Sequence, residues 1–176
     1  MDGNLWLILL IATVILFFFI FGWMAILEIR EIYSLGVRVE NALIASGWAG
    51  FSQVDLMKLS ERLDIDNLEG RELYLNKAQA QYMVESYIMQ NLRLDSGLRA
   101  LVDSFIQEKQ KPVIIEEITI YNPNELPALT SDGIRLTRTT IHIIVLIPKE
   151  IKFYGIAYLR KSVPVDIESF LANNQI

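Results

Sequence analysis

The feature that most constrains this chain is an unbroken apolar run near its N-terminus, from Leu5 to Leu27. A single threonine is the only polar side chain in the run. At about 1.5 Å per residue, a helix of this length covers about 34 Å, enough to cross a bilayer core of about 30 Å. Trp6 and Trp23 lie near the two ends, where aromatic rings with a polar edge prefer the headgroup region. The sequence therefore predicts a single-pass membrane anchor over residues 1–27.

A cleaved secretory signal is the alternative interpretation of this run. The core of such a signal usually covers about 7–15 residues after a basic start. Here the run is longer, no Lys or Arg precedes it, and no small-x-small cleavage site is evident. These features favour an uncleaved anchor. Its orientation stays open: Arg30 and Arg38 follow the span, and the positive-inside rule then favours a cytoplasmic C-terminal side.

Helix-compatible residues continue past the apolar run without a proline. We expect one helix over about residues 4–47, with residues 28–50 as a helical extension outside the lipid and Gly47–Gly50 breaking the helix. Part of this helix carries residues at a 3-4-3-4 spacing, which places them on one face. This stripe consists of Gly22, Ala25, Ile29, Ile32, Gly36, Val39 and Leu43.

The stripe is a candidate helix-packing interface. Gly22, Ala25 and Gly36 are small, so another backbone can approach closely, either from a copy of the chain or from a different subunit. The alternative is that the stripe packs on the protein's own domain, as most amphipathic helices outside membranes do. The three charged residues within 28–31 are expected to stay hydrated at the bilayer edge, with pairing between neighbouring subunits as the alternative.

Residues 51–176 are expected to form a soluble α+β domain, and its first half is rich in helix signals. Ser52 with Asp55 resembles a capping box that opens a short helix to about Leu63. An acidic turn follows over residues 64–70. Helical composition then covers residues 71–91, and an apolar spacing without a miss predicts a further helix over 98–106, which Pro112 ends.

The second half of the domain is expected to form strands. Three sequential strands most simply make an antiparallel meander, with one face resting on the helices. The residues between the first two strands contain two prolines, two asparagines and a glycine, which are typical of a loop. The expected elements are strands over Val113–Tyr121, Ile134–Ile147 and Phe153–Val165, a turn over Pro148–Lys152, and a final short helix over Ile167–Leu171.

Composition and motifs exclude several functions. The net charge of −5 makes the chain a poor partner for nucleic acid or for an anionic lipid surface. The absence of cysteine excludes thiol catalysis and Cys-based zinc sites. No nucleotide-binding or serine-hydrolase motif occurs. The single histidine, His142, lies in the most apolar strand and needs an orienting carboxylate and a nucleophile to act as a base. Glu116 and Glu117 are neighbours on a strand and are expected to point to opposite faces. We therefore expect no catalytic residues, no metal site and no cofactor.

This order of elements resembles the type IV pilin-like and pseudopilin group, and in particular the TadE-like pilus-assembly proteins of tight-adherence systems. The resemblance lies in the layout of an apolar helix with an amphipathic continuation and a small α+β domain, with local similarity in Val54–Leu56 and Asn91–Asp95. Prepilins in that group carry Gly or Ala before the mature start, and usually an acidic residue five positions on. Gly3 fits the first requirement but Ile8 replaces the acid, so processing is not carried over.

The resemblance implies a membrane-anchored structural or assembly protein, a minor pilin or assembly factor of a pilus or secretion-type complex. It implies contacts with the lipid bilayer and with other subunits, and a cell-membrane location with the domain on the extracytoplasmic side, in contrast to the charge bias. A second interpretation is a monomeric, membrane-tethered binding or sensory module with a deep pocket on its sheet. A membrane-bound enzyme is the third and requires convergent polar residues that the sequence does not show.

Overall fold

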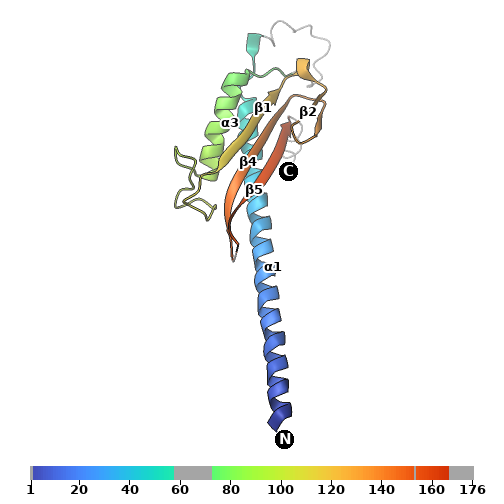
Figure 1. Cartoon of the computed structure of the whole chain (residues 1–176). Coiled ribbons are helices and arrows are strands. Elements are labelled where there is room, and N and C mark those ends of the chain that lie inside the picture. The colour runs from blue at the N-terminus through green and yellow to red at the C-terminus, as the bar shows by residue number, and fades with distance from the viewer. Residues whose placement is uncertain (1, 58–72, 153, 167–176) are drawn as a thin grey trace, which may run out of the picture.

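The computed structural model describes residues 2–57, 73–152 and 154–166, and its fold is α+β as expected. Helix α1 (Asp2–Phe51) is continuous over 50 residues, and its N-terminal half extends away from the domain (Figure 1). The most apolar window of this helix has a mean hydropathy of 2.8, and none of that window is buried by the protein itself. By length and composition α1 fits a single-pass membrane anchor.

The expectation that Gly47–Gly50 would break the helix is wrong, because α1 runs through both glycines to Phe51. A Cβ built on Gly47 would lie 2.7 Å from a methyl carbon of Val165. A Cβ on Gly50 would lie 2.6 Å from the nearest side-chain carbon of Ile141. These glycines therefore allow α1 to approach the sheet closely, and the close packing outweighs their low helix propensity.

The main sheet has the strand order β1-β4-β5, and both neighbouring pairs are antiparallel, which confirms the meander. Its strands are β1 (Ile114–Tyr121), β4 (Thr140–Ile151) and β5 (Gly155–Asp166). The predicted turn over Pro148–Lys152 is wrong, because β4 continues through Pro148 to Ile151. Strand β1 pairs with β4 only as far as Leu146, so Pro148 lies where one side of β4 has no neighbour in the sheet and its missing N–H costs no ladder bond.

The predicted strand over Ile134–Ile147 is divided in two. Strand β3 (Arg135–Leu136) pairs with β2 (Ala128–Leu129) in a small hairpin, and β4 begins only at Thr140. The predicted loop before it also contains the short 3-10 helix η1 (Pro123–Glu125). Just before β4, the Thr139 hydroxyl donates to the backbone carbonyl of Leu73. Leu73 is distant along the chain, so a local sequence pattern does not indicate this contact.

Helix α3 (Lys77–Leu92) confirms most of the helix expected over residues 71–91. The helix expected over 98–106 is wrong, because these residues form turns. The Asp95 carboxylate accepts from the backbone N–H groups of Gly97 and Arg99, and the ammonium of Lys109 donates to three backbone carbonyls of the segment. These side-chain bonds replace the helical ladder.

Several expected elements lie outside the described residues. The helix predicted from Ser52 is wrong over residues 52–55, because Val54 forms an antiparallel β-bridge with Leu75 and helical residues begin only at Leu56. The rest of that helix beyond Met57, the acidic turn over 64–70 and the final helix over Ile167–Leu171 are not described.

Helices α1 and α3 pack on one face of the main sheet, α1 against β4 and β5 and α3 against β1. Odd-numbered residues of β4 point into this core. The C-terminal part of α1, predicted as a helical extension over residues 28–50, contributes buried side chains to this core. The fully buried apolar residues of this core include Val39, Leu43, Val84, Ile88, Ile141, Ile143, Val145 and Ile147.

Candidate functional site

The structure divides the predicted stripe of α1 into an upper and a lower part. In the upper part, Gly36, Val39 and Leu43 are buried by the protein's own domain. A Cβ on Gly36 would lie 3.3 Å from Cε of Lys161 on β5. These three residues pack in the core formed by the chain's own sheet and α3. This part of the stripe therefore follows the alternative interpretation, in which the stripe packs on the protein's own domain.

The lower part of the stripe lies on the half of α1 that extends from the domain. Gly22, Ala25 and Ile29 are exposed there, and Ile32 at the boundary is partly covered. A Cβ on Gly22 would meet nothing within 4 Å, so the position is open. Gly22 lines an apolar hollow of about 450 Å³, together with Ile15, Phe18, Phe19, Trp23 and Ile26.

An ion-pair clamp joins α1 to the sheet at the end of the span. The ammonium of Lys149 on β4 donates to Glu31 Oε2 at 3.1 Å and to Gln107 Oε1 at 3.0 Å, and lies 3.8 Å from Glu28 Oε1. The Lys149 side chain is only 8% exposed. The carboxylates predicted to be hydrated at the bilayer edge are therefore paired within the chain, which holds the anchor in a fixed direction relative to the domain.

A second polar cluster lies on the face of the sheet that points away from α1, and it surrounds His142. The imidazole is fully buried. Its Nε2 lies 2.9 Å from the Ser162 hydroxyl oxygen on β5 and 3.2 Å from Asp132 Oδ1, while Nδ1 lies 3.5 Å from Glu117 Oε1 on β1. Asp132 comes from the turn between β2 and β3. The cluster thus ties the small hairpin to all three strands of the main sheet.

The position of Glu117 corrects the expectation that Glu116 and Glu117 point to opposite faces. The β1–β4 register shifts between Ile115 and Glu117, which is a β-bulge. Because of the extra residue, both carboxylates reach the face away from α1. Glu117 lies beside His142, and Glu116 accepts a hydrogen bond from Arg160 at 3.0 Å.

The residue types around His142 are those of a nucleophilic hydrolase, but the hydrogen bonds differ. In such a triad the histidine accepts the proton of the serine hydroxyl. Here the Ser162 hydroxyl donates to Asp132 Oδ2 at 2.5 Å, and the imidazole has no exposed surface for a substrate to reach. The hydrogen bonds of this cluster hold the β2–β3 hairpin against the sheet, which is a structural role.

Hydrogen bonds stabilise the ionised carboxylates of this cluster. The hydroxyls of Ser162 and then Thr130 lower the pKa of Asp132 from 3.8 to about 2. The hydroxyl of Ser131 is the main cause of the lowered pKa of Glu117, against an opposing effect of burial. Since the folded pKa values lie below the unfolded ones, both groups stabilise the fold above their unfolded pKa values, and this stabilisation is lost as the pH falls.

The first prediction concerns acid stability. In the detergent-solubilised chain, the contribution of Asp132 should disappear as the pH falls from about 4 to about 2. Asp132→Asn should lower the free energy of unfolding at pH 7 by about 1 kcal/mol, because solvent screens a side chain at the protein surface. Denaturant titrations from pH 7 to pH 2 would measure this. Glu85→Gln, at an exposed carboxylate of α3, is the control; equal losses in both variants would contradict the assignment.

Sequence reasoning missed Glu117, Asp132 and Ser162 as partners of His142. These residues lie on three different elements, and only the strand pairing and the hairpin bring them together. The one available signal was a histidine within an otherwise apolar strand, since a buried imidazole requires hydrogen-bond partners.

Comparison with protein-family models, curated proteins and solved structures found no match to this chain.

Proposed function

We propose that this protein is a structural or assembly subunit of a membrane complex, of the pilin-like or pseudopilin type, whose α1 helix packs against helices of other subunits. One observation carries the proposal: α1 is a single helix with its C-terminal half held in the domain and its N-terminal half uncovered. This is the layout on which the resemblance to pseudopilins and TadE-like pilus-assembly proteins depends. A role without catalysis agrees with the closed hydrogen bonds around His142.

The hollow around Gly22 supplies the packing surface in this proposal. In lipid, helices associate through close van der Waals packing, which small residues allow. Gly22 and Ala25 are exposed and lie about one turn apart, and large side chains line the hollow at Gly22. A side chain of a neighbouring helix fits into this hollow without a change in α1. The rigid clamp at Lys149 then orients the domain with respect to the packed helices.

Disulfide cross-linking in native membranes tests this proposal, because the chain contains no cysteine. Gly22→Cys, Ala25→Cys and Ile29→Cys should give adducts with another copy or another subunit on oxidation. Ile20→Cys is the matched control, since Ile20 lies in the same span about 160° around the helix from Gly22. Gly22→Leu in the Ala25→Cys chain should fill the hollow and reduce the adduct several-fold. Equal yields at all four positions, or no effect of Gly22→Leu, would contradict the proposal.

The tethered binding module remains the alternative proposal. It predicts a deep pocket on the sheet, whereas the face of the sheet away from α1 carries the β2–β3 hairpin, held there by Asp132 and Ser131. The same experiment distinguishes the two, because a monomeric module predicts no position-specific adducts from the lower part of α1.

A further inference from the structure

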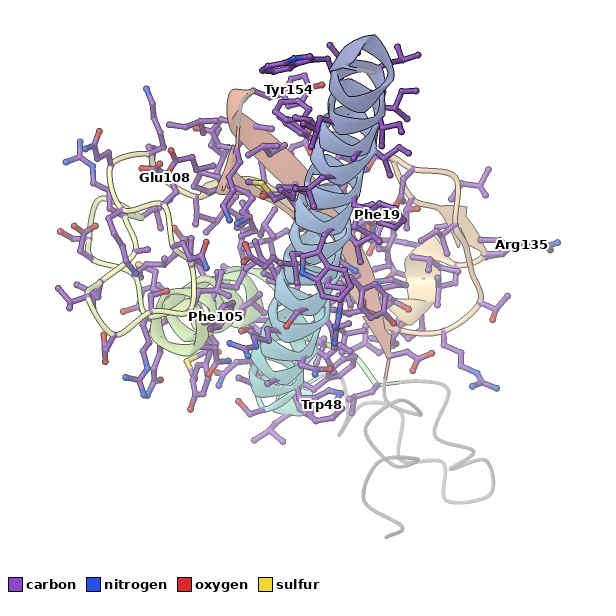
Figure 2. All side chains as sticks on the ribbon, turned by 90° about the horizontal axis from the view of Figure 1, so that it is seen from below. Phe19, Trp48, Phe105, Glu108, Arg135 and Tyr154 are labelled. Carbon is purple, nitrogen blue, oxygen red and sulfur yellow. The ribbon has the colours of Figure 1, made fainter. Side chains whose placement is uncertain are left out.

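A pocket of about 440 Å³ lies where α1 leaves the apolar span. Residues of α1, of the loop before β1 and of the end of β4 line it, and it is open to solvent. Leu27, the last residue of the apolar run, forms part of its wall together with Leu35 and Phe105. Seen from the N-terminal end of α1, Phe105 of the loop and Tyr154 of the β4–β5 hairpin lie on the same side of the helix, and Arg135 lies on the other side (Figure 2).

Basic side chains dominate the polar part of this pocket. Arg30, Arg38, Lys149 and Lys152 line it, with Glu31 as the single acidic lining residue. Lys149 is committed to the ion-pair clamp. The other three basic side chains belong to exposed residues, and none of them makes a hydrogen bond or ion pair with a residue that the structure describes. A chain with a net charge of −5 thus concentrates unneutralised positive charge in one place.

The lower basic residues lie at the depth of the lipid headgroups. Arg30 follows Leu27 by three residues, which is about 4.5 Å along the helix axis. The headgroup layer extends about 5–8 Å beyond each side of the hydrocarbon core. Lys152 lies just beyond β4, three residues after Lys149, which itself reaches Glu28 and Glu31. Both long cationic side chains are therefore placed to meet a group at the bilayer surface.

We infer that this pocket binds the phosphate-bearing headgroup of an anionic membrane lipid. The guanidinium of Arg30 offers two parallel N–H donors to a phosphate, and Lys152 adds a mobile point charge. The apolar wall at Leu27, the last residue of the apolar run, faces the glycerol and the upper acyl chain, in continuity with the span. Basic pockets beside a membrane helix are a known way to hold such headgroups. The site is present in a monomer and does not depend on the proposed assembly.

Native mass spectrometry of the full chain in detergent tests this inference, with dioleoyl-phosphatidylglycerol and dioleoyl-phosphatidylcholine as probes. The wild-type chain should retain the anionic lipid in preference to the zwitterionic lipid. Arg30→Gln with Lys152→Gln should weaken retention of the anionic lipid about tenfold or more and leave the other lipid unchanged. The matched control is Arg99→Gln with Arg135→Gln, which removes the same charge from exposed positions outside the pocket and should keep the preference.

A second variant guards against a loss caused by misfolding. Ser34 lines the pocket and is exposed, so Ser34→Glu introduces a negative charge without removing a basic residue and should also abolish the preference. Equal retention of the two lipids by the wild type, or an unchanged preference in both pocket variants, would overturn the inference. Displacement of the bound lipid by millimolar glycerol phosphate would assign the same phosphate chemistry to a soluble ligand and overturn the lipid assignment.

Discussion

A chain that begins at Glu28 is expected to fold as a soluble domain, whereas a chain that begins at Phe51 is expected to remain unfolded. The reason is the position of the second half of α1. Leu35, Val39 and Leu43 are buried in the core between α3 and the sheet. Loss of one such side chain costs about 2–5 kcal/mol, and a domain of this size has only about 5–15 kcal/mol in total.

The two truncations are compared by near-UV circular dichroism and thermal melting. The chain from Glu28 keeps the core and the clamp of Glu28 and Glu31 with Lys149, so it should melt in one cooperative transition. The chain from Phe51 should show no cooperative transition. A cooperative melt of that shorter chain would show that residues 51–176 form an independent domain and that the extension of α1 is dispensable.

Leucine at Gly50 is expected to destabilise the fold severely, and leucine at Gly22 is expected to leave it unchanged. A Cβ added at Gly50 would lie 2.6 Å from a side-chain carbon of Ile141 and 2.6 Å from one of Val84. Overpacking of a filled core costs about 1–3 kcal/mol and more for large side chains, which exceeds the gain of about 1 kcal/mol in helix propensity. At Gly22 nothing lies within 4 Å.

Denaturant titration of the full chain in detergent measures both variants under identical conditions. Gly50→Leu should lower the free energy of unfolding by about 3 kcal/mol or more. Gly22→Leu should change it by less than about 0.5 kcal/mol, as for other exposed sites, while still reducing cross-linking. A small effect at Gly50 would mean that α1 and the sheet can separate, and that the glycine serves the helix end after all.

The membrane anchor and the element types were predictable because they depend on local sequence patterns. An apolar run from Leu5 to Leu27 is sufficient to predict a spanning helix. Alternation and β-branched residues were sufficient for β1 and β5. The failed predictions depend on contacts that a local pattern does not contain. The segment Leu98–Ile106 has a helical spacing, yet side chains of Asp95 and Lys109 bind its backbone groups, and such competition is not encoded in the spacing.

A helix long and apolar enough to span a membrane, the α+β class and the antiparallel meander followed from local patterns, because apolar length and periodicity act over short distances along the chain. Which half of the α1 stripe is free depends on tertiary contacts, because α3, β4 and β5, all distant along the chain, bury the upper half. The tertiary structure also decided that Glu117, Asp132 and Ser162 gather around His142, and that Arg30 and Lys152 share one pocket. The cluster around His142 depends on strand register and a bulge, and a shift of one residue in register would turn the side chains of Glu117 and Ser162 to the other face.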